Sequence, residues 1–174
     1  KMAQEVLIWA VEIALTIFLA FMLVYFIGLR TSAVGQSMAQ TIYNGDSIFV
    51  NRLVYAVSDP KANDIIVFRP DGNEKSHLYV KRVIGVPGDT VQIVQGIVYV
   101  NGEVFDEAVS TPSIEEPGLA MEPIVLKEDE YFVLGDNRNN SEDSRFANIG
   151  NVQKEFIIGK VWLRMVSWSE FEFM

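Results

Sequence analysis

A nearly unbroken apolar segment runs from Val6 to Ile27, with the sequence VLIWAVEIALTIFLAFMLVYFI. A helix needs about 20 such residues to cross the hydrocarbon core of a bilayer. A cleaved signal peptide usually has a shorter apolar stretch of about 7 to 15 residues, and a buried helix normally shows a polar face. We therefore expect residues 1–30 to be a retained transmembrane anchor.

Beyond Arg30 the sequence changes to short β-branched or aromatic runs, each introduced by a glycine, asparagine or aspartate turn signal. This pattern predicts an all-β domain over residues 31–174, with Asn101-Gly102 as a hairpin turn. The predicted strands cover residues 47–51, 65–68, 79–84, 90–94, 97–100, 131–134 and 157–165.

The stretch from Glu107 to Pro123 differs from the rest of this domain because it combines three prolines with several acidic residues. Prolines interrupt strand pairing, so the stretch indicates a small subdomain inserted between strands of the sheet. We place this insertion at about residues 95–128 and expect it to carry no chemistry.

The composition excludes several classes of site. The chain has 14 basic and 23 acidic residues and a net charge of −9, which argues against a nucleic-acid partner. It contains no cysteine and one histidine, His77, so a cysteine nucleophile and a multi-histidine metal site are both impossible. We expect neither a metal nor a cofactor.

Two residues are candidates for chemistry, although each also has an ordinary structural explanation. Ser37 follows the apolar segment in the run GQSMAQT and could be a simple loop serine. Strand alternation places Lys81 on one face with Tyr79 and Val83, among apolar neighbours. Burial there would lower the pKa of the lysine and make a neutral amine available, whereas a lysine on an exposed edge strand would stay charged.

A third polar segment, GDNRNNSEDSR, follows the apolar strand that ends at Leu134. Such a density of polar side chains is typical of a turn that hydrogen-bonds to itself. The same side chains could hold a lysine amine and brace a site through pairs of aspartate and arginine.

These segments together resemble the conserved boxes of bacterial type I signal peptidases, and the branch typical of Gram-positive bacteria in particular. The resemblance covers nearly the whole chain and rests on a membrane anchor followed by G-x-S-M, G-D-S-I, N-D-I-I-V-F, K-R-V-I-G-V-P-G-D and G-D-N-R-x-x-S-x-D-S-R. It implies a serine protease with a β-fold of coiled antiparallel sheets.

The resemblance also implies a role for individual residues. Ser37 would be the nucleophile and Lys81 the general base, without a histidine. Ser141 would orient the Lys81 amine. An ion-pair network would brace the loop, formed by Asp143 with Arg145 and by Arg82, while Asp136 and Asn137 look structural.

Two positions beside Ser37 depart from the family pattern. Many members carry a serine hydroxyl for the oxyanion at the position of Gly35, so we expect backbone donors to stabilise the oxyanion here. The family motif S-M-x-P-T has glutamine, Gln40, in place of its proline, and we expect a looser turn after Ser37.

The resemblance predicts that the substrates are secretory preproteins, which are cut after small residues at the −3 and −1 positions. Met38, Ile42 and Tyr43 are candidates for contact with substrate or membrane. The aromatic residues of the tail either meet the bilayer interface or pack in the protein; they are Trp162, Trp168, Phe171 and Phe173.

The predicted location is the plasma membrane, crossed once, with a cytoplasmic N-terminus and an extracytoplasmic catalytic domain. The predicted partners are signal peptides, the lipid bilayer and the secretion translocon. Three alternatives stay open: an inactive relative that serves in assembly, another Ser-Lys hydrolase, and a Ser-His-Asp hydrolase that uses His77. The last lacks the G-x-S-x-G elbow.

Overall fold

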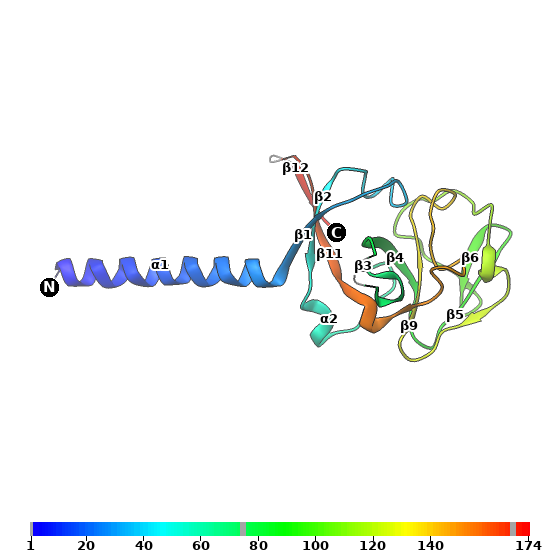
Figure 1. Ribbon diagram of the computed structural model, residues 1–174, viewed down its shortest axis with the longest axis horizontal. Coiled ribbons are helices and arrows are strands. Elements are labelled where there is room, and N and C mark those ends of the chain that lie inside the picture. The colour runs from blue at the N-terminus through cyan, green and yellow to red at the C-terminus, as the bar shows by residue number, and fades with distance from the viewer. Residues whose placement is uncertain (1, 74–75, 168–169) are drawn as a thin grey trace.

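The computed structural model describes residues 2–73, 76–167 and 170–174. Helix α1 (Met2–Ile27) extends away from a body made of β-strands (Figure 1). Its segment Gln4–Met22 is long and apolar enough to cross a membrane, and none of that segment is buried against the protein. The predicted apolar N-terminal helix is therefore confirmed, and no protein core covers its segment Gln4–Met22.

Strand β1 (Gly28–Ser32) follows α1 without a linker and pairs with β2 (Ser47–Asn51). It begins inside the segment that we assigned to the anchor, so the sheet starts earlier than expected. Gly28 makes the change of direction possible, because a Cβ there would lie 2.9 Å from the carbonyl oxygen of Val24. The polar residues of β1 hide it from a pattern of hydrophobic alternation.

The larger sheet is antiparallel and has the strand order β1-β2-β11-β3-β4-β9-β10, with β12 paired to β11. Apolar runs form its centre, and the predicted strands in this sheet are confirmed with ends that differ by at most a few residues. Its remaining strands are β3 (Ile65–Phe68), β4 (Tyr79–Gly85), β9 (Glu130–Leu134), β10 (Val152–Gln153), β11 (Ile157–Ser167) and β12 (Glu170–Phe173).

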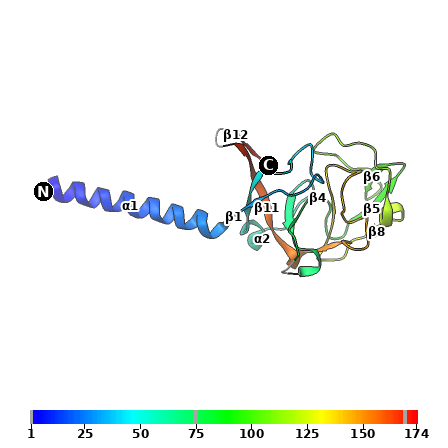
Figure 2. The ribbon, with the colours of Figure 1, turned by 45° about the horizontal axis from the view of Figure 1, so that its top comes forward.

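The smaller sheet has the order β7-β6-β5-β8 and lies at the end of the molecule opposite α1 (Figure 2). Positive φ angles at Asn101 (54°) and Gly102 (83°) confirm the predicted hairpin turn. Its strands are β5 (Thr90–Val94), β6 (Ile97–Val100), β7 (Glu103–Val104) and β8 (Ile124–Val125), and the short helix η2 (Gly118–Met121) precedes β8. The sheet thus begins with β5, before the expected insertion at residues 95–128.

Three short helices connect strands of the larger sheet: α2 (Val54–Val57), η1 (Pro70–Gly72) and η3 (Lys154–Phe156). One apolar cluster is important for the site because it includes Met38 and Ile42 together with Val67 and Val161. The segment that follows β1 is therefore packed against the larger sheet through its apolar side chains, and this packing holds the polar residues between them near β4.

The aromatic residues of the tail lie on the exposed edge formed by β11 and β12. Trp162 is 43% exposed, Phe171 62% and Phe173 70%. The Phe173 ring lies 6.3 Å from that of Trp162 and 6.4 Å from that of Phe171, measured between centroids. These three rings form an exposed cluster rather than part of the core, while Trp168 lies outside the described residues.

Candidate active site

Strand β4 carries two adjacent buried cations, and the alternation of a strand sends them to opposite faces. Lys81 is 2% exposed and lies opposite Ile66 of β3 in the register, on the face of Val83. The apolar surroundings favour the neutral amine. Burial lowers the pKa of Lys81 to about 8, although nearby carboxylates oppose this shift. Of the two explanations left open for Lys81, the structure shows the buried lysine and not the exposed edge-strand lysine.

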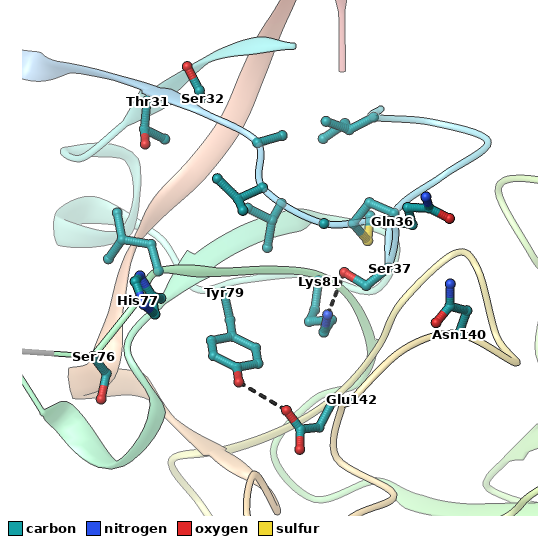
Figure 3. Close-up of a pocket in the computed structure, with 17 residues that line it drawn as sticks. Thr31, Ser32, Gln36, Ser37, Ser76, His77, Tyr79, Lys81, Asn140 and Glu142 are labelled. Atoms are coloured by element: carbon teal, nitrogen blue, oxygen red, sulfur yellow. Dashed lines mark hydrogen bonds between the residues drawn. The ribbon is translucent and has the colours of Figure 1, made fainter. Parts of the chain in front are cut away.

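The segment of residues 33–42 brings Ser37 to this lysine. A backbone hydrogen bond from Ala33 N to Asp46 O begins the segment, and one from Ile42 N to Met38 O closes a turn after Ser37. The Nζ atom of Lys81 then lies 2.7 Å from Ser37 Oγ (Figure 3). An ammonium donates to the hydroxyl at this distance, whereas a neutral amine can accept the hydroxyl proton.

The 135–145 loop holds the backbone on either side of Ser37. The N–H of Asn137 donates to Ser37 O at 3.0 Å, and its side-chain amide donates to Gln36 O at 3.1 Å. Gly135 permits this close approach, because a Cβ there would overlap Ser37 O and the Ser141 side chain. Asn137 is thus structural, as expected, but its contacts place it against the candidate nucleophile itself.

Arg82, on the other face of β4, forms an ion pair with a carboxylate of the same loop. Its Nε and Nη2 atoms each donate to Asp136 at 2.7 Å, and both side chains are almost fully buried. Nη1 donates to Asn63 O at 3.0 Å. The Thr41 hydroxyl donates to the same Asp136 carboxylate at 2.5 Å. This network connects β4, the loop and the segment that carries Ser37.

Ser141, Asp143 and Arg145 form a second network in the loop. Arg145 Nε donates to Asp143 Oδ1 at 2.8 Å, and Gly135 N donates to Asp143 Oδ2 at 3.1 Å. The Ser141 hydroxyl donates to Asp143 at 2.7 Å. Within the described part of the chain, no hydrogen bond joins Ser141 to Lys81, so the orienting role expected for Ser141 stays a prediction.

The stretch 107–123, which we expected to carry no chemistry, contacts this loop. Arg138 is 1% exposed, and its Nη1 and Nη2 atoms each lie 2.6 Å from an oxygen of Glu107. Arg138 Nε donates to Gly135 O at 3.1 Å. Glu107 therefore neutralises the buried charge of Arg138. Arg138 in turn contacts Gly135, the glycine that lies against Ser37 O.

A groove of about 620 Å³ opens beside Ser37 and Lys81. Met38 and Ile42 line it, whereas Tyr43 lies outside it with its ring 5.2 Å from the guanidinium of Arg164. His77 is an exposed residue of the groove wall. The hydrogen-bond partner of the Ser37 hydroxyl among the described residues is Lys81 rather than His77, which weakens the hypothesis of a Ser-His-Asp site.

The two departures from the family pattern lie in turns with positive φ. Gly35 has φ 95°, and apart from its two chain neighbours none of the described residues comes within 4 Å of the position that its Cβ would occupy. Gln40 has φ 108°, a value that proline cannot adopt because its ring fixes φ near −65°. The turn after Ser37 therefore has a backbone conformation at Gln40 that a proline in this position would not allow.

Sequence patterns did not single out Thr41, Gly135 or the pair formed by Glu107 and Arg138. Each acts through a contact between segments far apart in the chain. Gly135 begins a polar run directly after a buried strand, which is the one local signal that a close backbone approach occurs there.

Comparisons with known proteins identify relatives that cover most of this chain. A family model described as signal peptidase, peptidase S26, matches residues 6–168. The chain is 37% identical over 149 residues to a probable signal peptidase I-2 from Synechocystis, covering 79% of this chain and 66% of that protein. It is 35% identical to signal peptidase I P from Bacillus subtilis subsp. natto, covering 90% and 86%. Identity to signal peptidase IB from Staphylococcus aureus strain MRSA252 is 32%, covering 99% and 95%.

Proposed function

The chain belongs to the signal peptidase family, peptidase S26, and from this premise we propose that it is a type I signal peptidase, a serine endopeptidase that removes signal peptides from exported preproteins. The observation that carries the proposal is the 2.7 Å contact between Ser37 Oγ and the buried Nζ atom of Lys81. A hydroxyl is a weak nucleophile unless an adjacent base takes its proton, and a lysine of lowered pKa supplies that base.

Acylation begins when Ser37 Oγ attacks the scissile carbonyl carbon while its proton moves to the neutral Lys81 amine. The new C–O bond forms as the carbonyl π electrons move to the carbonyl oxygen. When the tetrahedral intermediate collapses, the C–N bond breaks and the leaving amine takes the proton from the Lys81 ammonium. The signal peptide is then an ester on Ser37, and the mature protein leaves with a free amine.

Deacylation uses the same base a second time. Lys81 takes a proton from water, and the hydroxide oxygen attacks the ester carbon. Collapse breaks the C–O bond to Ser37, which recovers its proton from Lys81. Burial suits both half-reactions, because an amine with a pKa of about 8 accepts and returns a proton near neutral pH.

The oxyanion of both intermediates would be stabilised by backbone donors, with the N–H of Ser37 as the first candidate. Gly35 offers no hydroxyl at the position where many relatives have one. Its φ of 95° makes any side chain at that position strained, so the turn itself favours glycine. This arrangement is consistent with an oxyanion site made of main-chain N–H groups.

Ser141 supports Lys81 in this proposal by accepting a hydrogen bond from the amine. Its hydroxyl proton already points to Asp143, so its oxygen lone pairs are available to an N–H donor. Asp143 is held in turn by Arg145. The network would thereby set the rotamer of Lys81 without providing a second base.

The substrate would be an extended chain with small residues at the −3 and −1 positions, bound in the groove beside Ser37. Met38 and Ile42 are buried in the wall of this groove, next to Ser37 in the sequence or in the lining. We propose that they limit the size of the residue that precedes the cut.

The membrane arrangement is proposed on the same premise. The exposed apolar helix α1 would cross the plasma membrane once from a cytoplasmic N-terminus, so the catalytic domain would lie outside, where signal peptides emerge. The exposed rings of Trp162, Phe171 and Phe173 suit the headgroup region, and Tyr43 is exposed as well. The bilayer and the secretion translocon are the partners that this placement predicts.

The test is cleavage of a preprotein by the detergent-solubilised full chain, with Ser37→Ala and Lys81→Ala as the decisive variants. We expect the wild type to release the mature protein and each variant to lose activity by at least about 10³-fold. His77→Ala should retain activity. A folded wild type that is inert on several preproteins, or a Lys81→Ala variant with full activity, would contradict the proposal.

A further inference from the structure

Tyr79 stands between the candidate base and an acidic residue of the groove. Its ring centroid lies 5.4 Å from Lys81 Nζ, and its hydroxyl donates to Glu142 Oε2 at 3.1 Å. All three residues line the groove that contains Ser37, and Figure 3 shows the Glu142 carboxylate directed toward the Tyr79 hydroxyl. The carboxylate is therefore close to the reacting groups without touching them.

Glu142 is fixed from two sides although it is an exposed residue. Asn148 Nδ2 donates to Glu142 Oε1 at 2.5 Å, and Tyr79 occupies the other oxygen. Both partners are neutral: burial and Glu142 raise the pKa of Tyr79, so its phenol keeps the proton that it donates. The two hydrogen bonds hold the carboxylate in place but leave its negative charge uncompensated.

Four charged side chains act on Lys81. Asp143, Glu142 and Asp136 favour its ammonium form, while Arg145 opposes it. Asp143 is paired with Arg145, and Asp136 is paired with Arg82. Glu142, in contrast, has no ion-pair partner within the described residues. The segment 33–42 and strand β3, which also pack near Lys81, contain no charged residue. Glu130 of β9, the other strand paired with β4, forms an ion pair with Lys127. Among the described residues around Lys81, Glu142 is therefore the acid that lacks an ion-pair partner.

We propose that Glu142 is a positioning residue for the base, whose carboxylate, held by Tyr79 and Asn148, stabilises protonated Lys81 and raises the pH at which its amine can activate Ser37. This inference rests on the proposed function, because it assigns Lys81 the role of base. It implies that Lys81 stays an ammonium between turnovers at low pH. Activity at low pH is therefore lower than it would be without Glu142.

The experiment compares Glu142→Gln with Glu128→Gln in the detergent-solubilised full chain. Glu128 is an exposed acid outside the groove, so the control removes the same charge from a remote position. The measurement is kcat/KM on a preprotein between pH 5.5 and about 10. For Glu142→Gln we expect the acid limb to move down by about 0.5 pH unit, which is about threefold higher kcat/KM at low pH. Glu128→Gln should follow the wild type.

Tyr79→Phe tests the tether, because it keeps the ring over Lys81 and removes the hydroxyl that holds Glu142. Its acid limb should move in the same direction as that of Glu142→Gln, by a smaller amount. A Glu142→Gln limb that stays in place or moves up would overturn the proposal. A Tyr79→Phe profile that coincides with the wild type would overturn the role of the tether.

A second readout needs no turnover. NMR titration of ¹³C-labelled lysine, with the Lys81 signal assigned through Lys81→Met, reports the pKa of Lys81 in wild type and Glu142→Gln. If the wild type cleaves no preprotein but the Lys81 titration moves down in Glu142→Gln, the proposed function fails and the electrostatic effect of Glu142 stands. If cleavage depends on Ser37 and Lys81 but neither the limb nor the titration moves, only the role of Glu142 fails.

Discussion

The two faces of β4 treat neighbouring cations in opposite ways. Arg82 is met by both oxygens of Asp136 and by two further oxygen partners, so its charge is balanced and every bond is directional. Lys81, one residue earlier, shares its face with apolar side chains and has the hydroxyl of Ser37 as its hydrogen-bond partner. Arg82 thus forms a structural ion pair that connects β4 to the loop. Lys81 lies in an environment that disfavours its charge.

This difference shows how a single strand can supply both stability and reactivity. A guanidinium cannot lose its proton in a protein, so its burial requires a carboxylate. An amine can respond to burial by losing its proton, so it tolerates the absence of a partner. The loop that supplies Asp136 to one face also contacts Ser37, which meets Lys81 on the other. Four measurements can show whether the two faces are separable.

The largest expected effect is that of Lys81→Met, which keeps the volume of the side chain and removes the amine. Activity should fall by at least about 10³-fold. The free energy of unfolding at pH 7 should rise by about 2 kcal/mol. The fall of the Lys81 pKa from 10.5 to about 8 corresponds to about 3 kcal/mol of destabilisation that the variant removes, and the lost hydrogen bond to Ser37 offsets about 1 kcal/mol of that gain. This gain is fully present below pH 8 and disappears as the pH rises toward 10.5.

Chemical denaturation of wild type and Lys81→Met at pH 7 and at pH 10 checks this expectation. If the variant is less stable than the wild type at both pH values, then burial of the amine is not the cost that the structure indicates.

On the other face, Asp136→Asn should destabilise the protein by about 3 kcal/mol, because it leaves the Arg82 guanidinium buried without a counter-charge. The matched control is Asp59→Asn, which breaks the ion pair of an exposed carboxylate with Lys154 and should cost less than about 1 kcal/mol. Urea denaturation measures both. Equal losses of stability in the two variants would show that the buried pair of Asp136 and Arg82 matters no more to the fold than an exposed ion pair.

The pH dependence of wild-type activity is the third test. Since Lys81 acts when neutral, kcat/KM should rise with pH and level off above a midpoint of about 8. Activity at pH 7 should be about tenfold below the plateau. A midpoint in the range of an ordinary histidine that disappears in His77→Ala would instead move the base away from β4.

The smallest effect is expected at Thr41, whose hydroxyl joins the segment of Ser37 to the Arg82 face. Thr41→Val removes the donor to Asp136 and the acceptor for Arg82 Nη2. It should lower the free energy of unfolding by about 1 kcal/mol and reduce activity only a few-fold. Thr41→Ser keeps the hydroxyl and should behave like the wild type, as measured by thermal unfolding and initial rates. Identical stability and activity of the two variants would show that the Thr41 hydroxyl contributes to neither face of β4.

Much of the fold could be predicted because it depends on local patterns. The length of the apolar segment predicted α1, and short runs of β-branched or aromatic residues predicted the central strands β2, β3, β4 and β9. The short strands β7, β8 and β10 could not be predicted, since two residues carry almost no propensity and each is defined by its pairing partner. Strand β1 was missed because its polar residues break the alternation.

For the site, composition and motifs specify the chemical inventory: a serine and a lysine in polar segments, one histidine and no cysteine. The folded chain sets which buried cation has a carboxylate and which faces a hydroxyl. Pairing depends on distances set by sheet register and by the 135–145 loop, which bring residue 37 to residue 81 and residue 136 to residue 82. Lys81 and Arg82 are chemically similar neighbours in the sequence, and their different environments exist only once the two faces of β4 are covered.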